Sequence, residues 1–193
     1  MSYASAQHDR MLAGLVKGCY VVAVDLAASP PVCRVSDGEW VSSWVRWHSI
    51  AAGKARHWRA PSLGEQGTLI STSGDVSQGT FVPGLYGNGG PPPDNRDHVE
   101  VWRFDDGGSL VYDWQAKSYC ISLPTGTVTI KVGATTAEVT DDAVRVTSTT
   151  INLKAAVNIK GPVKIDGALH VTQNITSDGS IIDTSGNSNH HSH

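Results

Sequence analysis

Residues 157–181 read VNIKGP-VKIDGA-LHVTQN-ITSDGS-I, and this stretch decides the fold of the chain. Apolar side chains recur at the first and third positions of a six-residue unit, and glycine recurs at the fifth. The alternation of apolar and polar residues is typical of a very short strand, and the glycine allows a positive φ in the turn that follows. The stretch is therefore a repeat with a period of six residues.

Two architectures are built from such repeats. In the left-handed β-helix of hexapeptide-repeat acyltransferases, three repeats of one chain form each coil, and many coils are needed to bury a core. In an intertwined trimer, each chain contributes one strand to each layer, so a few repeats suffice and the strand edges become paired. Only roughly five regular repeats are present, fewer than two coils of a single-chain helix. The sequence therefore favours a homotrimer, with an acyltransferase-like protein as the alternative.

Aromatic residues divide the chain into two parts. All six tryptophans lie before residue 115, and no Phe, Trp or Tyr follows Tyr119. A globular core would use several aromatic side chains, whereas a slender β prism has no room for them on its axis. We therefore expect a trimeric β-helix stem, which opens with alternating strands at Val99–Trp102, Leu110–Tyr112 and Cys120–Leu123.

The part before the stem has the pattern of a small β domain. Short apolar strands such as Val21–Val24 and Val32–Val35 are separated by Gly- and Pro-rich turns, which suits a small barrel such as an OB-fold. Ser5–Val16 can form a short helix before the barrel. The predicted segments of this all-β chain are an N-terminal helix or arm (1–16), an OB-fold domain (17–87), a Gly/Pro linker (88–97), the stem (98–175) and an apex (176–193).

The chain ends in His190-His191-Ser192-His193, a pattern suited to holding a metal ion. Side chains alternate along an extended strand, so His191 and His193 point to the same side. Three parallel copies would bring six imidazole nitrogens to one axis, an octahedral set that suits a first-row transition metal. Six-coordination disfavours zinc, so iron, nickel and cobalt remain open. His190 is out of phase with the pair and Ser192 is expected to point outward, so neither is assigned as a ligand.

Composition limits the possible partners and the cellular location of the protein. The net charge of −3 gives no case for a nucleic-acid partner. The three cysteines show no CxxC spacing and are expected to be reduced, buried thiols. The first ten residues lack the pattern of a signal peptide, and the longest apolar run, Tyr20–Val24, is far too short to cross a bilayer. We therefore expect synthesis in the bacterial cytoplasm, with no signal peptide or transmembrane segment.

Four motifs in order resemble the central spike, or baseplate assembly protein V, of contractile-tailed phages and phage-tail-like particles. Trp58–Gly67 is similar to the Trp-x-x-Pro-x-x-Gly-Glu-Gln segment of that family, and Ser73–Asp75 to the Gly-Asp turn that follows it. Phe104–Ser109 is similar to the opening of the family's β-helix. Gly186–His193 is similar to its tip. The resemblance covers nearly the whole chain.

The resemblance implies a homotrimer in which an OB-fold barrel is followed by an intertwined triple-stranded β-helix with a metal-capped apex. His191 and His193 of three chains would hold one iron ion, and Asp183 or Asn187 could host other axial ions. The OB domain would dock on the baseplate or tail hub protein. The tip would be driven through the host outer membrane when the sheath contracts, which makes the protein a virion tail baseplate component.

Other functions have weaker support. The barrel region holds Arg46, Lys54, Arg56 and Arg59 among Trp44, Trp47 and Trp58, a pattern found in OB-folds that bind single strands. The simpler interpretation puts the tryptophans in the barrel core and the basic residues on its rim, so no nucleic acid is expected. No Ser-His-Asp constellation, HExxH motif or P-loop is present, so the chain is not predicted to be an enzyme. A trimeric glycan-binding tail fibre is an alternative.

Overall fold

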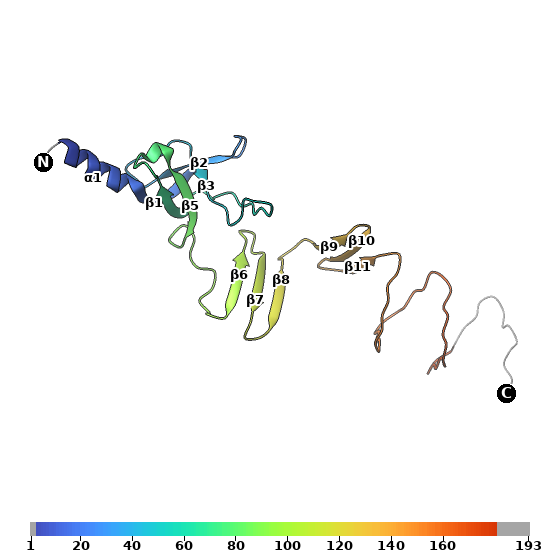
Figure 1. The fold of residues 1–193 in the computed structure, drawn as a ribbon. Coiled ribbons are helices and arrows are strands. Elements are labelled where there is room, and N and C mark those ends of the chain that lie inside the picture. The colour runs from blue at the N-terminus through green and yellow to red at the C-terminus, as the bar shows by residue number, and fades with distance from the viewer. Residues whose placement is uncertain (1–2, 181–193) are drawn as a thin grey trace, which may run out of the picture. The chain divides into compact units, whose positions relative to one another are not determined.

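A computed structural model describes residues 3–180 of the chain. These residues form one α-helix, α1 (Tyr3–Leu15), one short 3-10 helix and eleven β-strands in three sheets (Figure 1). The chain separates into two compact units at Val128, after which only Val139–Ala143 returns to the first unit. Apart from the helices the fold is all-β, as the sequence predicts.

The first sheet has five strands in the order β2-β1-β4-β5-β3. They are β1 (Val16–Asp25), β2 (Val32–Ser36), β3 (Arg46–Trp47), β4 (Gln66–Ile70) and β5 (Thr80–Leu85), with the 3-10 helix η1 (Val76–Gln78) between β4 and β5. Neighbouring strands are antiparallel except β3 and β5, which are parallel. The first half of β1 pairs with β4 and its second half with β2, and a bulge between Val21 and Ala23 allows the strand to bend between them.

The sheet curls into a nearly closed barrel because its two edge strands meet. The amide of Cys33 in β2 donates a hydrogen bond to the carbonyl of Val45, directly before β3, and the amide of Val45 donates one back, each at 2.9 Å. A five-stranded, partly open barrel is the OB architecture that the sequence predicts. The predicted strand Val32–Val35 is confirmed as β2, whereas β1 is longer than the predicted Val21–Val24.

The barrel core is small and contains no tryptophan. It consists of Cys19, Val21, Cys33, Val35, Val45, Leu69 and Phe81. Trp40 and Trp47 pack against its edge, while Trp44 and Trp58 are exposed. The expectation of a tryptophan-filled core is therefore wrong. The interior of so small a barrel is filled by one phenyl ring and branched or small side chains, so the larger indole rings lie at its edge or outside it.

Helix α1 is attached to the barrel by a close backbone approach. A Cβ atom at Gly14 would lie 2.2 Å from the carbonyl oxygen of Gly74, so only glycine fits there. The amide of Ser71 donates a hydrogen bond of 2.8 Å to the carbonyl of Leu15 at the end of the helix. Among residues 3–180, no helix is long and apolar enough to cross a membrane.

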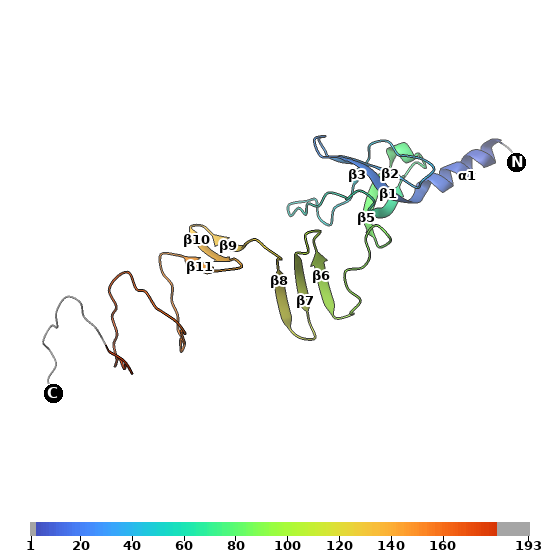
Figure 2. The same cartoon turned by 180° about the vertical axis from the view of Figure 1, so that it is seen from behind.

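The second sheet is an antiparallel meander in the order β6-β7-β8, seen from the opposite side in Figure 2. Its strands are β6 (Val99–Arg103), β7 (Ser109–Asp113) and β8 (Ser118–Ser122). They confirm the three strands predicted for the start of the stem. The β6–β7 turn contains Gly107, whose φ of 88° requires the conformational freedom of glycine.

The third sheet has the order β11-β10-β9. Its strands are β9 (Val128–Val132), β10 (Thr135–Val139) and β11 (Val144–Thr147). Strand β10 was not predicted, since its sequence Thr-Thr-Ala-Glu-Val has no regular apolar alternation. Strand β5 was also missed, because Pro83 and Gly84 inside it are residues that normally interrupt a strand.

The six-residue repeat forms regular bends but no strands. In residues 148–180 the backbone bends at 149, 155, 161, 166–167, 172–173 and 178–179, about every six residues. No residue of 148–180 lies in a strand, although the repeat predicts very short ones. A strand requires a hydrogen-bonded neighbour, and the single chain supplies none along this segment.

Candidate assembly surface

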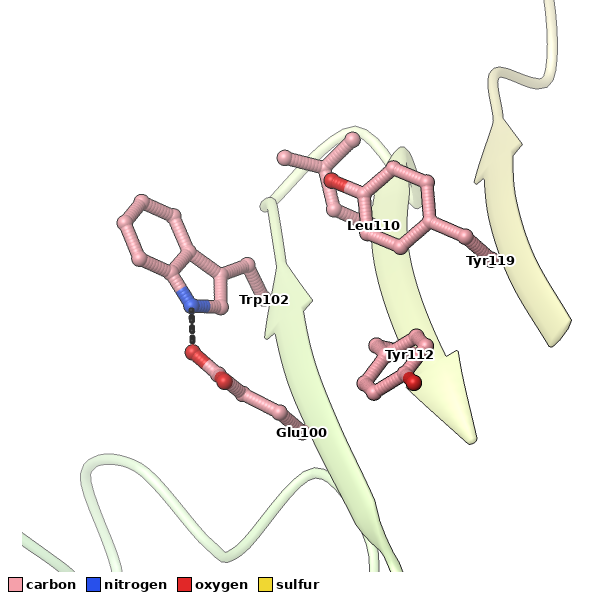
Figure 3. Close-up of a pocket in the computed structure, with 5 residues that line it drawn as sticks. All are labelled: Glu100, Trp102, Leu110, Tyr112 and Tyr119. Atoms are coloured by element: carbon pink, nitrogen blue, oxygen red, sulfur yellow. Dashed lines mark hydrogen bonds between the residues drawn. The ribbon is translucent and has the colours of Figure 1, made fainter. Parts of the chain in front are cut away.

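The β6-β7-β8 sheet has one strongly apolar face. Registered pairs place Glu100, Tyr112 and Tyr119 in one row, and Trp102, Leu110 and Ile121 in the next. Because side chains alternate along each strand, these six residues project from the same side of the sheet. Figure 3 shows five of them on that side. We call these six residues the aromatic face.

The aromatic face is open to solvent in the single chain. A hollow of about 370 Å³ lies between Glu100, Trp102, Leu110, Tyr112 and Tyr119 (Figure 3). Trp102 is 44% exposed and Tyr119 is 63% exposed. Large apolar side chains that gather on one exposed face mark an interaction surface, whereas isolated ones do not.

Two contacts order the side chains of the aromatic face. The indole Nε1 of Trp102 donates a hydrogen bond of 3.0 Å to Oε1 of Glu100, so the polar atom of the ring has a partner. The rings of Tyr112 and Tyr119 lie side by side with centroids 6.3 Å apart. The face therefore presents ring surfaces outward while one of its polar groups is satisfied locally.

The opposite face of the same sheet has a different composition. It carries Val99, Val101, Arg103, Ser109, Val111, Asp113, Ser118, Cys120 and Ser122. The polar residues stand at the two ends of the strands and leave only a short valine and cysteine row between them. We call this side of the sheet the polar face. An antiparallel sheet with one apolar and one polar face buries the apolar one. The aromatic face is therefore the side of the sheet that requires a partner.

The linker is fastened to the polar face by an ion-pair network. The guanidinium of Arg96 lies 2.8 Å from a carboxylate oxygen of Asp94 and 3.3 Å from one of Asp113 at the end of β7. The hydrogen bonds from Arg96 hold the pKa of Asp94 well below its usual range. His98 lies 3.9 Å from the same carboxylate of Asp113. These exposed charges suit a surface that stays in water.

The repeat segment exposes a second apolar surface. Its apolar residues are more than one-third exposed in the single chain: Ile151, Leu153, Val157, Ile159, Val163, Ile165, Leu169, Val171 and Ile175. They recur at the first and third positions of successive units, so an extended chain places each pair on one side. Nine large aliphatic side chains along one segment exceed what a folded single chain normally leaves in water. The segment therefore presents an apolar surface that the fold of the single chain leaves uncovered.

The metal ligands predicted at the C-terminus, His191 and His193, lie outside the described residues, as do Asp183 and Asn187. Within residues 3–180, no three His, Cys, Asp or Glu side chains are gathered in a way that could hold a metal ion. His48 contacts Thr80 at 2.8 Å, and His98 contacts Asp97 at 3.0 Å.

The cysteines are free thiols, as predicted. Cys19 and Cys33 are buried in the barrel core, while Cys120 is exposed on the polar face of the second sheet. Burial is the main cause that raises the pKa of Cys33 to about 11. The two core thiols are therefore protonated at neutral pH and act as small apolar side chains. The prediction that all three are buried is wrong for Cys120 in the single chain.

Part of the basic and aromatic cluster on the barrel surface is engaged in side-chain contacts. The guanidinium of Arg59 donates two hydrogen bonds to the carboxylate of Glu65, one of them at 2.8 Å. Arg34 lies 5.8 Å from the ring centroid of Trp44. Trp47 and Trp58 stack at a tilt, with centroids 5.7 Å apart. Trp44, Trp47, Trp58 and Arg59 thus have side-chain contacts, while Arg46 and Lys54 form no ion pair among residues 3–180.

The aromatic face was not identified from sequence, although its signal was present. Glu100 and Trp102 alternate with Val99 and Val101, so both faces of β6 hold apolar residues and neither stands out. Only the cross-strand register, which sets Trp102 beside Leu110 and Leu110 beside Ile121, gathers the larger side chains on one side.

Two known families match consecutive parts of the chain. Residues 17–86 match the family described as the Type VI secretion system/phage-baseplate injector OB domain, and this range holds the barrel. Residues 100–179 match the family described as Gp138, beta helical trimerization domain, and this range holds the aromatic face and the repeat segment. An injector OB domain followed by a β-helical trimerization domain defines a baseplate-type spike.

The similarity to a known protein extends across both domains. The chain is 31% identical over 179 residues to the spike protein of Escherichia phage P2, in an alignment that covers 92% of this chain and 82% of that protein. The chain therefore belongs to the family of this phage spike protein. The resemblance to central spikes that the four sequence motifs carry is confirmed.

Proposed function

We propose that three copies of the chain assemble through their aromatic faces and repeat segments into the central spike of a contractile tail. Membership of the spike family makes the protein a structural component of the tail baseplate. The observation that carries the trimer is the exposed apolar surface of residues 100–175, which a single chain cannot cover. Parallel copies would cover it by turning the same face inward.

The trimer can be tested with two substitutions on neighbouring positions of β8. Ile121 belongs to the aromatic face and Ser122 to the polar face of the same sheet. Ile121→Glu should abolish the trimer, because it puts three carboxylates into an apolar interface. Ser122→Glu should leave it intact. Light scattering should give three times the 20.5 kDa chain mass for the unmodified protein and for Ser122→Glu.

Two results of this experiment would contradict the proposed assembly. The first is a monomeric unmodified protein. The second is an Ile121→Glu variant that remains trimeric, which would favour the competing function, a fibre whose Trp102, Tyr112 and Tyr119 bind a glycan from outside. Circular dichroism distinguishes loss of assembly from loss of folding, because the barrel strands pair within one chain and should keep their signal in a folded monomer.

Within the spike, the OB domain is the part that docks on the baseplate hub. The match of residues 17–86 to an injector OB domain supports this assignment. The stem and apex pass through the host outer membrane when the sheath contracts. A slender β-helix without aromatic residues after Tyr119 suits this mechanical task, and the protein carries out no chemical reaction of its own.

At the apex, His191 and His193 of the three chains hold one iron ion. The His-x-His spacing at the end of a threefold repeat supports this, since three copies supply six neutral imidazole nitrogens. The ion fastens three chain ends, where fraying is easiest. Its contribution is structural, because all six coordination positions are filled by protein.

A further inference from the structure

Positive charge is concentrated in one part of the stem. Between Arg145 and Ile165 there are four basic residues and no acidic one, although the whole chain has a net charge of −3. Three of the four, Lys154, Lys160 and Lys164, lie in the repeat segment, and we call them the lysine belt. Their side chains are exposed and form no ion pair within the described part of the chain.

The repeat fixes the side of the stem on which the lysine belt lies. Lys154 and Lys160 occupy the fourth position of their six-residue units and Lys164 occupies the second, whereas the apolar residues occupy the first and third. Positions that alternate with an inward apolar pair point outward. In the proposed trimer, on which this step rests, three lysines from each of three chains would form a band of nine ammonium groups around the stem, spread over three successive units of the repeat.

The acidic residues nearby neutralise only part of this charge. Asp166 occupies the fourth position of the unit after Lys160, so it can offset one lysine of each chain. The next carboxylate, Asp178, lies two units further along. A surface with this excess of ammonium groups attracts phosphate. The lysine ammonium is a compact positive charge, and it donates hydrogen bonds to phosphate oxygens.

We propose that the lysine belt binds the phosphate groups of an anionic membrane surface as the spike enters it. Each lysine near such a surface adds to the attraction, and the contribution falls off within a Debye length. Single-stranded nucleic acid is the less suitable polyanion, because its binding relies on stacking on aromatic side chains. The stem offers none between Cys120 and Ser180.

The test uses the full chain and two kinds of vesicle. Phosphatidylcholine vesicles with added phosphatidylglycerol should bind the spike in a sedimentation assay, and pure phosphatidylcholine vesicles should not. The variant K154Q/K160Q/K164Q should bind the anionic vesicles at least roughly tenfold more weakly. The variant R46Q/K54Q/R56Q removes the same charge from the barrel and should bind as the unmodified protein does. Raising the salt concentration should release the bound spike.

Several outcomes would overturn the inference. They are equal binding to both kinds of vesicle, undiminished binding by the lysine-belt variant, or tighter binding to single-stranded DNA than to anionic vesicles. A normal trimer mass for every variant separates this failure from failure of the proposed assembly. Lysines that serve only to keep strand edges from pairing would give a trimer with no preference for anionic vesicles.

Discussion

Gly67 in β4 lies where the barrel core leaves no space for a side chain. A Cβ atom at this position would be 2.6 Å from the ring of Phe81 and 2.3 Å from the carbonyl oxygen of Val82. The phenyl ring is fully buried and the oxygen belongs to a paired strand, so neither can move cheaply. The Trp58–Gly67 motif therefore ends in a glycine because a larger residue would clash with the barrel core.

Gly67→Ala should destabilise the barrel by about 1–3 kcal/mol, the usual cost of forcing an extra methyl group into a packed core. Urea unfolding monitored by tryptophan fluorescence measures this, because four of the six tryptophans lie in the barrel domain. Gly18→Ala in the neighbouring β1 is the matched control, since no atom lies within 4 Å of its Cβ position. Equal unfolding midpoints for both variants would contradict the packing argument.

Glu65 makes the stability of the barrel depend on pH. Burial alone would raise the pKa of its carboxyl, but hydrogen bonds from Arg59 and from the amide of Ser62 outweigh burial and lower it. A carboxyl whose pKa is lower in the folded state stabilises the fold above its unfolded pKa, about 4.3. That stabilisation is lost as the pH falls through the lowered pKa.

Glu65→Gln should therefore flatten the fall in the free energy of unfolding below about pH 4.3, because an amide does not titrate. Urea unfolding at a series of acidic pH values measures the slope. Glu39→Gln, at an exposed position without an ion pair among residues 3–180, should retain the slope of the unmodified protein. An unchanged slope in Glu65→Gln would show that the Arg59–Glu65 pair does not carry the effect.

At the scale of the element, local pattern predicted the strands whose apolar residues alternate. Val32–Val35 became β2 and Val99–Trp102 became β6, because alternation, β-branched residues and flanking turns agreed there. Trp40–Trp47 alternates only in part and yields the two-residue β3. The bends of the repeat segment follow the predicted period of six, yet its strands are missing from the single chain. The period of the repeat determines where the backbone bends. Strand pairing in this segment depends on neighbouring strands, which the single chain does not supply.

The repeat predicts opposite effects for adjacent residues. Ile159 occupies the third, inward position of its unit, and Asn158 the second, outward position. Ile159→Asp should dissociate the trimer, because three carboxylates would meet in its apolar interior. Asn158→Asp should change the trimer mass little. Analytical ultracentrifugation over a range of concentrations checks both, and a stable Ile159→Asp trimer would contradict the assignment of inward positions.

At the scale of the whole molecule, sequence patterns predicted the order of the barrel and the stem. They did not predict which side chains contact one another. A barrel followed by a threefold stem could be inferred because both have local signatures, namely Gly- and Pro-separated strands and the six-residue repeat. The exposure of Trp44 and Trp58 could not be inferred from the sequence, since it depends on the width of the closed barrel. The aromatic face likewise depends on the register of three strands.

Elemental analysis of the purified trimer tests the apical metal. We expect one iron ion for every three chains in the unmodified protein. The variant H191A/H193A should lose the iron and keep the trimer mass, because it leaves the aromatic face and the repeat segment, through which the chains are proposed to assemble, unchanged. His170→Ala, at a position outside the terminal motif, should retain the metal. Full iron content in H191A/H193A would exclude these two residues as the ligands.

The absence of strand pairing in residues 148–180 of the single chain has a consequence for the order of folding. The barrel closes with hydrogen bonds inside one chain, so it can form as soon as that chain is released. In the proposed trimer, the repeat segment has no such bonds to make until two other chains arrive. Its formation is therefore a reaction of higher kinetic order, and dilution should slow it without slowing the barrel. Each spike would thus begin as three chains with folded barrels and unpaired repeat segments. The local concentration of these chains would determine the rate at which the stem forms.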